Sequence, residues 1–248
     1  MQFADRIALV TGAGSGIGRA VSLMLAAEGA IVVLVGRDRA RLEAVAAECA
    51  GTGGEAVVSP ADVTQRGAIE AVVDGIGARW GRLDLAVNNA GGHGDFKPLH
   101  ETPVDECEWV FDLNLKAVFY GMRAEVSLML RQGHGAIVNM ASIFGIKGVA
   151  GIAHYVAAKH AVVGMTRAAA LDYARTGIRI NAVSPGATET PNLLRVTGGD
   201  AHALDAMIPA GRVGQPQDVA RTVRWLLSDD ARYVTGANVS VDGGMSAG

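Results

Sequence analysis

Short runs, mostly apolar and in 7–11 nearly unbroken, alternate with longer amphipathic segments along this chain. The runs occupy positions 7–11, 31–35, 56–59, 85–88, 136–140, 179–183 and 238–241. Unbroken apolar character is typical of strands that are buried on both faces of a parallel sheet. The pattern therefore predicts a single α/β domain, a doubly wound parallel sheet of about seven strands with helices on both faces.

Helical periodicity fills most of the intervals between these runs. We expect helices at 17–27, at 39–49 behind a cap at Asp38, at 65–80, at 102–131, from 153 to at least 170, and after Pro216. In the fourth of these, Pro103 is expected at the first helical position. Segment 191–209 has weak periodicity, and it is expected to form either an apolar, mobile lid over a substrate or an ordinary loop.

A glycine-rich segment, TGAGSGIG at 11–18, follows the first predicted strand. Glycines allow a sharp turn there, and backbone N–H groups at the start of the next helix would face a pyrophosphate. The alternative is an ordinary strand-to-helix turn. The common GxGxxG spacing is absent, because Ile17 stands where its third glycine is due.

Ser142, Tyr155 and Lys159 are the candidate catalytic residues. The helical run from 153 places Tyr155 and Lys159 four positions apart on one face, where an ammonium is expected to lower the pKa of the phenol. Ser142 follows a predicted strand and would hold a carbonyl oxygen for Tyr155. Taken alone, the Tyr/Lys pair also fits an amphipathic helix face with a lysine that reaches solvent.

These motifs occur together in the order and spacing of a known family. The chain resembles the short-chain dehydrogenase/reductases over essentially its whole length, with TGxxxGxG at 11–18, NNAG at 88–91, and Ser142 followed by YxxxK at 155–159. The resemblance implies hydride transfer between a nicotinamide and a carbonyl or secondary alcohol carbon, with Tyr155 as general acid or base. An NAD(P)-binding sensor without turnover is the alternative, and an epimerase or dehydratase is a more distant one.

The resemblance also assigns roles to single residues. Lys159 would tune Tyr155 and bind the ribose, and Asn114 would interrupt its helix so that its backbone carbonyl holds a water near the lysine. Asp62 either lies against the adenine with Val63 or caps the next helix. Thr188 departs from the family's usual Ile or Val, so a backbone role is expected for it. The full set of expected cofactor contacts is Gly12, Ser15, Gly16, Ile17, Gly18, Arg37, Asp62, Val63, Asn89, Ala90, Gly91, Tyr155, Lys159, Pro185, Gly186, Thr188 and Thr190.

The end of the second predicted strand bears on the choice of nicotinamide cofactor. An acidic residue there accepts hydrogen bonds from the ribose 2′-hydroxyl of NAD. Gly36 removes that carboxylate, and Arg37 offers donors to a 2′-phosphate, so the sequence favours NADP. NAD is the alternative, because Asp38 lies two positions beyond Gly36.

Composition narrows the possible partners. The net charge is −3 with no cluster of basic residues, so neither nucleic acid nor a membrane is expected as a partner. Cys49 and Cys107 lack metal-ligand spacing, so no metal site is expected. The first apolar stretch is too short for a signal peptide, which favours a cytoplasmic protein. Apolar residues on several faces of the helices at 102–131 and 153–176, together with the resemblance, favour a homotetramer.

A small carbonyl or alcohol substrate is expected in a modest, partly apolar pocket. The candidate walls are the lid and six side chains, His93, Phe96, Phe144, Ile146, Val149 and His154. Neither histidine is expected to be a catalyst.

Overall fold

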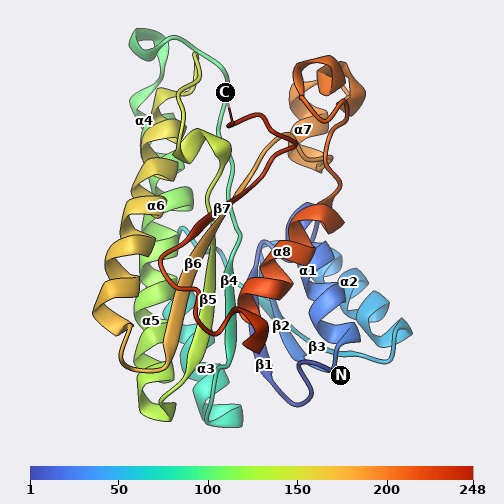
Figure 1. Ribbon diagram of the computed structural model, residues 1–248, viewed down its shortest axis with the longest axis vertical. Coiled ribbons are helices and arrows are strands. Elements are labelled where there is room, and N and C mark those ends of the chain that lie inside the picture. Colours follow the sequence, from blue (N-terminus) through green and yellow to red (C-terminus); the bar gives the residue numbers. More distant parts are fainter. Residues whose placement is uncertain (248) are drawn as a thin grey trace.

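Seven parallel strands form one sheet in a computed structural model that describes residues 1–247 (Figure 1). The strands are β1 (Ile7–Thr11), β2 (Ile31–Gly36), β3 (Glu55–Pro60), β4 (Leu85–Asn88), β5 (Gly135–Met140), β6 (Ile178–Pro185) and β7 (Asn238–Val241). Their order across the sheet is β3-β2-β1-β4-β5-β6-β7, and each neighbouring pair is parallel. This confirms the predicted doubly wound sheet.

Helices cover both faces of the sheet (Figure 1). On one face α1 (Gly16–Ala27) packs against α2 (Arg39–Gly51) and α8 (Pro216–Leu227). On the other face lie α3 (Ala68–Trp80), α4 (Val104–Phe111), α5 (Ala117–Gln132) and α6 (Ala153–Tyr173). Within residues 1–247, none of the helices is both long and apolar enough to cross a membrane.

The five inner strands contribute to two separate cores, because successive side chains of a strand point to opposite faces, whereas the edge strands β3 and β7 pack only against the first core. In β1, Ala8 and Val10 belong to the core beneath α1, α2 and α8, whereas Ile7 and Leu9 belong to the core beneath α3, α5 and α6. Burial on both faces is the reason why the inner strands are apolar at nearly every position.

Two predicted helices, 65–80 and 102–131, begin or continue differently in the structure. Helix α3 begins at Ala68 and not at 65, because Gly67 has a φ of 85° and so stands in the left-handed region as the cap. Pro103 is the N-cap of α4 and not its first residue. The predicted helix at 102–131 is divided: α4 ends at Phe111, a π-helical turn spans Asp112–Lys116, and α5 follows.

Segment 191–209 contains regular structure of its own. Helix α7 (Pro191–Val196) begins it, and a 3-10 helix (Ala201–Met207) follows. The Thr190 hydroxyl caps α7 by accepting a hydrogen bond from the Leu193 amide at 3.3 Å, and Pro191 follows as the first helical residue.

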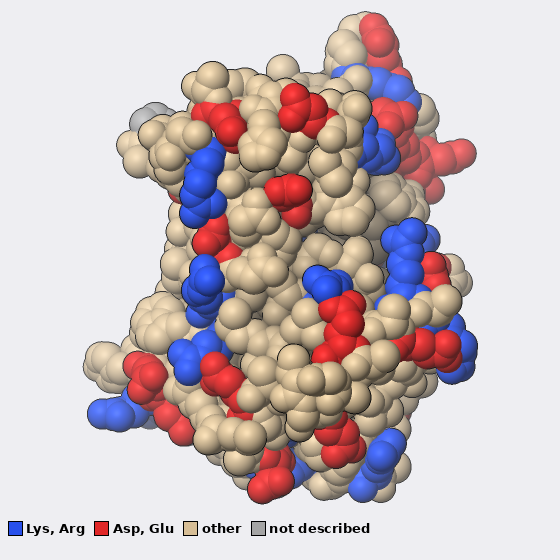
Figure 2. All heavy atoms as spheres, turned by 90° about the vertical axis from the view of Figure 1, so that its right-hand side faces the viewer, with Lys and Arg blue, Asp and Glu red and all other residues tan. Residues whose placement is uncertain are grey.

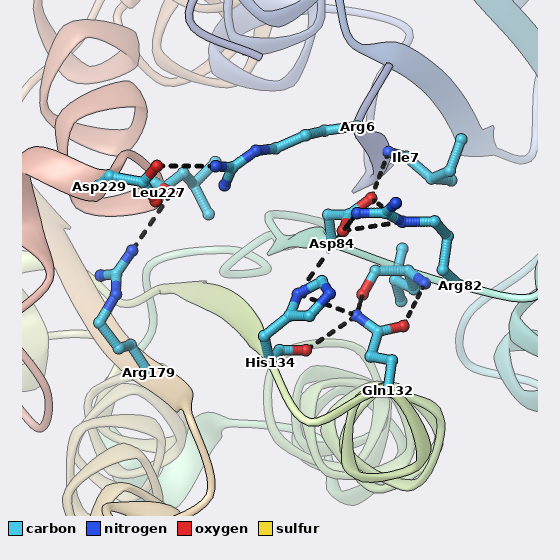
Figure 3. Close-up of polar contacts among 10 residues, drawn as sticks. Arg6, Ile7, Arg82, Asp84, Gln132, His134, Arg179, Leu227 and Asp229 are labelled. Carbon is cyan, nitrogen blue, oxygen red and sulfur yellow. Dashed lines mark hydrogen bonds and ion pairs between the residues drawn. The ribbon is translucent and has the colours of Figure 1, made fainter. Parts of the chain in front are cut away.

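Polar groups at the amino ends of the strands are bonded to one another and to the backbone (Figure 3). Asp84, which is 2% exposed, accepts a hydrogen bond from the Ile7 amide at 2.8 Å and pairs with Arg82. On β6, Arg179 donates to the carbonyls of Leu226, Leu227 and Ser228. These bonds join strand ends to helix ends.

The charged side chains are mixed in sign on the face turned toward the viewer in Figure 2. This face is the right-hand side of Figure 1, and Lys or Arg side chains alternate there with Asp or Glu. Charged side chains of the protein also form ion pairs, among them Arg19 with Glu48 and Arg224 with Glu28.

Candidate active site

A cavity of about 850 Å³ lies at the carboxyl ends of the strands. The sheet order reverses its direction of growth between β1 and β4, and open α/β sheets bind ligands at such a switch point. Most of the predicted site residues line this cavity: Gly12, Ser15, Gly16, Ile17, Arg37, Asp62, Val63, Asn89, Ala90, Gly91, Ser142, Tyr155, Lys159, Pro185, Gly186, Thr188 and Thr190. Gly18 and Asn114 lie behind its surface.

The glycine loop between β1 and α1 requires glycine at specific positions. Gly12 has a φ of 66°, a conformation that side chains disfavour. At Gly18 a Cβ atom would lie 2.2 Å from the Gly12 carbonyl oxygen, so no larger residue fits there. Gly18 therefore lets α1 approach the loop closely, which leaves the amide groups at the start of α1 facing the cavity.

The segment Asn89 to Gly91 is tied to the end of β1. The Thr11 hydroxyl accepts hydrogen bonds from the amides of Asn89 and Ala90 at 2.9 and 3.0 Å. The Asn89 side chain donates to the Thr11 carbonyl at 2.9 Å. Asn89 thus joins the loop after β4 to the loop after β1. Thr11 takes part in the same bonds, although it was not among the predicted contacts.

Asp62 and Val63 line the cavity beyond β3. The Asp62 carboxylate accepts hydrogen bonds from the amide and the hydroxyl of Thr64, at 3.0 and 2.7 Å. It closes a turn in the loop and does not cap α3, which begins later at Ala68. On the other side, Thr188 donates its hydroxyl to the Gly186 carbonyl at 3.2 Å.

Asn114 is fully buried in the π-helical turn between α4 and α5. Its side chain donates to the carbonyls of Gly92 and Val110 at 2.7 and 2.8 Å and accepts from the Gly92 amide at 3.2 Å. These bonds engage the amide group with the loop after β4. A π-helical turn interrupts the regular pattern of backbone hydrogen bonds in a helix. Because the side chain of Asn114 is already bonded, a relay through this residue would use its backbone carbonyl.

Ser142, Tyr155 and Lys159 converge at one end of the cavity. Ser142 follows β5 and caps a 3-10 turn (Ile143–Gly145) through a 3.2 Å bond from the Phe144 amide. Tyr155 and Lys159 lie on α6, and the lysine Nζ atom is 5.6 Å from the centre of the tyrosine ring. At Gly145 a Cβ atom would lie 2.8 Å from the Lys159 carbonyl oxygen, so this glycine brings the serine turn against α6.

Burial governs the protonation of this set. It raises the pKa of Tyr155 to about 12, although the Ser142 side chain acts in the opposite direction. It lowers the pKa of Lys159 to about 7. The expectation that Lys159 lowers the pKa of Tyr155 is therefore wrong for the free protein. The physical reason is that Lys159 is only 2% exposed, so burial disfavours its charge, and the 2.8 Å bond that Nζ donates to the Met140 carbonyl does not offset this.

Arg37 and Asp38 differ in what they contact. Arg37 is exposed and lines the cavity where β2 ends. Asp38 caps α2: its carboxylate accepts from the Arg41 amide at 3.2 Å and pairs with the Arg41 side chain at 3.1 Å. Arg41 also lines the cavity, and its place one turn into a predicted helix gave no signal of this in the sequence.

The substrate end of the cavity is mainly apolar. Of the predicted walls, His93, Phe96 and Phe144 line it, whereas Ile146, Val149 and His154 do not. Segment 191–209 contributes further walls, and the remaining ones were missed in the sequence: Leu113, Ile143, Ile152 and Met245. Met245 reaches the site from the end of the chain, where its carbonyl accepts a 2.7 Å bond from the Lys147 ammonium.

One contact joins segment 191–209 to the loop after β4. The Arg195 guanidinium on α7 lies 3.4 Å from the Asp95 carboxylate and donates to the Gly94 carbonyl at 3.3 Å. Elsewhere, Cys49 and Cys107 are free thiols. Among residues 1–247, no three His, Cys, Asp or Glu side chains are grouped so as to hold a metal ion.

Known proteins share this arrangement over the full chain. The family described as enoyl-(acyl carrier protein) reductase matches residues 12–246. Cyclohexanol dehydrogenase of Acinetobacter sp. (strain SE19) is 43% identical over 246 residues, which are 99% of this chain and 97% of that protein.

Two solved structures are also similar. The crystal structure of levodione reductase superposes with a TM-score of 0.96 at 41% identity and covers 99% of each chain. A variant of actinorhodin polyketide ketoreductase, crystallised with NADPH, has a TM-score of 0.92 at 37% identity, covering 98% of this chain and 97% of that one. With these full-length similarities and the motifs in place around one cavity, the chain belongs to the short-chain dehydrogenase/reductase family.

Proposed function

We propose that this chain, an NAD(P)-dependent oxidoreductase of alcohols and ketones, uses NADP(H) and acts on six-membered ring ketones and the matching secondary alcohols. The observation that carries the proposal is the meeting of Ser142, Tyr155 and Lys159 at the mainly apolar end of a cavity whose other end has the glycine loop and Arg37.

Tyr155 is the proton donor in the direction of ketone reduction. The bound nicotinamide would supply the hydride. Ser142 holds the substrate oxygen beside the phenol, and the raised pKa keeps Tyr155 protonated at neutral pH, as a general acid must be. As the substrate oxygen gains negative charge, the donors around it become more effective.

Lys159 has two tasks in this scheme. It donates hydrogen bonds toward the ribose, and its charge, when present, stabilises a phenolate at Tyr155. Burial disfavours that charge in the free protein, so polar cofactor groups next to Nζ are needed to favour it. Asn114 supports the lysine through the backbone of the π-helical turn, which lies against the same loop as Gly91.

The residues at the adenosine end fit NADP(H). Gly36 carries no carboxylate to repel a 2′-phosphate, and Arg37 is exposed beside the cavity. Asp38 is occupied as the cap of α2, which argues against its turning toward a ribose hydroxyl. The fit extends along Ser15, Gly16 and Ile17 to Pro185 and Thr190.

Comparison of both cofactors on the parent and on Arg37→Ala tests this preference. Because hydrogen bonds to charged groups contribute about 1.5 to 3 kcal/mol, kcat/KM should favour NADPH by about ten- to a hundredfold in the parent, and the variant should lose that preference. Arg39→Ala is the matched control, since Arg39 lies two positions away and pairs with Glu43. Equal activity with NADH in the parent would exclude the NADP assignment.

The substrate class rests on the apolar walls and on the relative that is a cyclohexanol dehydrogenase. Phe96, Leu113, Phe144 and Ile152 offer contact area for a ring but few polar partners. A panel of open-chain and cyclic ketones and alcohols, followed by nicotinamide absorbance, tests it. Cyclohexanone and cyclohexanol should give the higher kcat/KM. A clear preference for open-chain acyl substrates would reject the ring class.

Segment 191–209 is proposed as the lid over this substrate. Its α7 and 3-10 helix supply walls of the cavity, and Arg195 joins it to the loop at Gly94 and Asp95. These contacts are exposed, so they contribute little to stability and allow opening.

The protein is further proposed to be a cytoplasmic homotetramer. Large apolar side chains are exposed on α4, α5 and α6, at Trp109, Phe119 and Leu171. Burial of such side chains between copies of the chain would remove them from water. Light scattering at micromolar protein concentration tests the assembly, and a monomer there would reject it.

A further inference from the structure

His93 lies next to the proposed proton donor, on the loop between β4 and α4. Its ring centre is 5.8 Å from that of Tyr155, with 77° between the planes, and 5.4 Å from that of Phe96. The ring lines the cavity together with both of these residues. His93 is therefore a polar side chain in an otherwise mainly apolar substrate wall.

The ring nitrogens of His93 have hydrogen-bonding capacity that the protein itself does not satisfy. Its Nδ1 atom is buried and unpaired, so it faces the protein and not the cavity. Nε2 is not among the buried unpaired atoms of residues 1–247, and it is the ring nitrogen left to meet a ligand in the cavity that His93 lines. Burial lowers the pKa of the ring, while the Gly94 backbone acts in the opposite direction, and the titratable groups nearby are Arg195, Asp95 and His154. At neutral pH the ring is thus uncharged, with one nitrogen able to donate and the other able to accept.

The loop that carries His93 is fixed on both sides. Asn114 bonds both the amide and the carbonyl of Gly92, at 3.2 and 2.7 Å. Beyond the histidine, the Asp95 amide donates to Glu106 at 2.6 Å and the Lys97 amide donates to the Gly151 carbonyl at 2.8 Å. A side chain held by a supported loop is already in position before the substrate binds, which is what a specificity contact needs.

We infer that His93 is a specificity-determining residue that hydrogen-bonds a second oxygen on the substrate ring, while the reacting oxygen lies between Ser142 and Tyr155. The inference rests on the proposed ring-ketone function and adds the chemical class, namely ring ketones that carry a further hydroxyl or carbonyl group. A polar atom such as Nε2, held at the wall of a mainly apolar cavity, discriminates against substrates that lack the matching group.

The test compares cyclohexanone with its 3-hydroxy and 4-hydroxy analogues, using the NADPH-loaded protein. The readout is the ratio of kcat/KM for the better hydroxyketone to that for cyclohexanone. His93→Phe keeps a ring of similar shape without the nitrogens, and it should lower this ratio about five- to tenfold, mainly through KM for the hydroxyketone. His93→Gln restores a donor and an acceptor and should recover part of the ratio.

Phe144→Leu is the control, because it changes the same wall without a polar atom. An unchanged ratio in His93→Phe, or an equal fall in Phe144→Leu, overturns the inference and leaves the ring-ketone function standing. A parent enzyme that reduces none of the three ketones, yet reduces open-chain ones, overturns the proposed substrate class and this inference with it.

Discussion

The two edges of the sheet treat buried polar groups differently. At the amino edge, Asp84 and Arg179 each contact several partners, most of them backbone groups (Figure 3). At the carboxyl edge, Lys159 makes one hydrogen bond and His93 leaves Nδ1 without a partner. Since an unpaired buried polar group costs free energy, the bonds of Asp84 and Arg179 favour stability, although Gln2 Oε1 and Glu28 Oε2 at the same edge are buried without partners. Lys159 and His93 at the carboxyl edge keep hydrogen-bonding capacity for ligands.

Tyr155→Phe tests the functional role of the carboxyl edge, and it has the largest expected effect. It removes the proton donor and keeps the ring, so kcat should fall on the order of a hundred- to ten-thousandfold. Steady-state reduction of the best ketone measures it. The thermal unfolding temperature and cofactor affinity should change little. A variant that works at the parental rate would remove Tyr155 from the acid role.

Glu125 tests whether a buried polar group at the carboxyl edge lowers stability, because it is a fully buried acid beside the carboxyl end of β4. Burial raises its pKa to about 8, although a 3.0 Å bond from the Asn88 amide opposes the shift. A raised folded-state pKa means that its stabilising contribution is complete below about pH 4.5 and is lost as the pH rises through about 8.

Glu125→Gln stays neutral at every pH and keeps the shape. Its free energy of unfolding relative to the parent should therefore improve from pH 5 to pH 8.5, by on the order of 3 kcal/mol. Urea unfolding at the two pH values measures this difference. A constant difference between the proteins would mean that Glu125 does not titrate in this range.

Asp84→Ala breaks the amino edge with a smaller effect. The variant leaves the buried Ile7 amide and Arg82 without their partner, which should cost about 1 to 3 kcal/mol of unfolding free energy while kcat stays near the parental value. Asp229→Ala is the control, because the Asp229 side chain is 77% exposed in its pair with Arg6, and its loss should cost at most about 1 kcal/mol. Equal losses in the two variants would contradict the contrast between buried and exposed pairs.

The inner strands could be predicted from the sequence because burial on both faces requires apolar residues at nearly every position, as in β1. The edge strand β7 alternates polar and apolar residues, and the predicted 238–241 agrees with it in both bounds. The cavity-lining loops were predictable for a related reason, since glycine spacing reports local backbone needs. Contacts between residues distant in sequence could not be predicted. Nothing near Glu125 in the sequence indicates its bond to Asn88, and nothing near Met245 indicates its place in the substrate wall.

The shifted pKa values of the candidate catalytic residues also could not be predicted from the sequence. The spacing of Tyr155 and Lys159 indicated adjacency, but the lowered pKa of the lysine depends on burial by the whole fold. The family resemblance did predict an interruption of the helix at Asn114, and the π-helical turn is found there, whereas helical periodicity alone does not report it or the bonds of the side chain to Gly92.

The position of β1 between β2 and β4 in the sheet has a consequence for how the protein folds. Its carboxyl end meets that of β4 through Thr11 and Asn89, which are 78 residues apart in sequence. Local helices and the β1-β2 pair form from near neighbours, whereas this junction requires closure of a long loop, which slows folding. During refolding, recovery of nicotinamide binding should therefore lag behind recovery of the helical circular dichroism signal. The reason is that the loops after β1 and β4, which line the cofactor cavity, are among the last parts to be assembled.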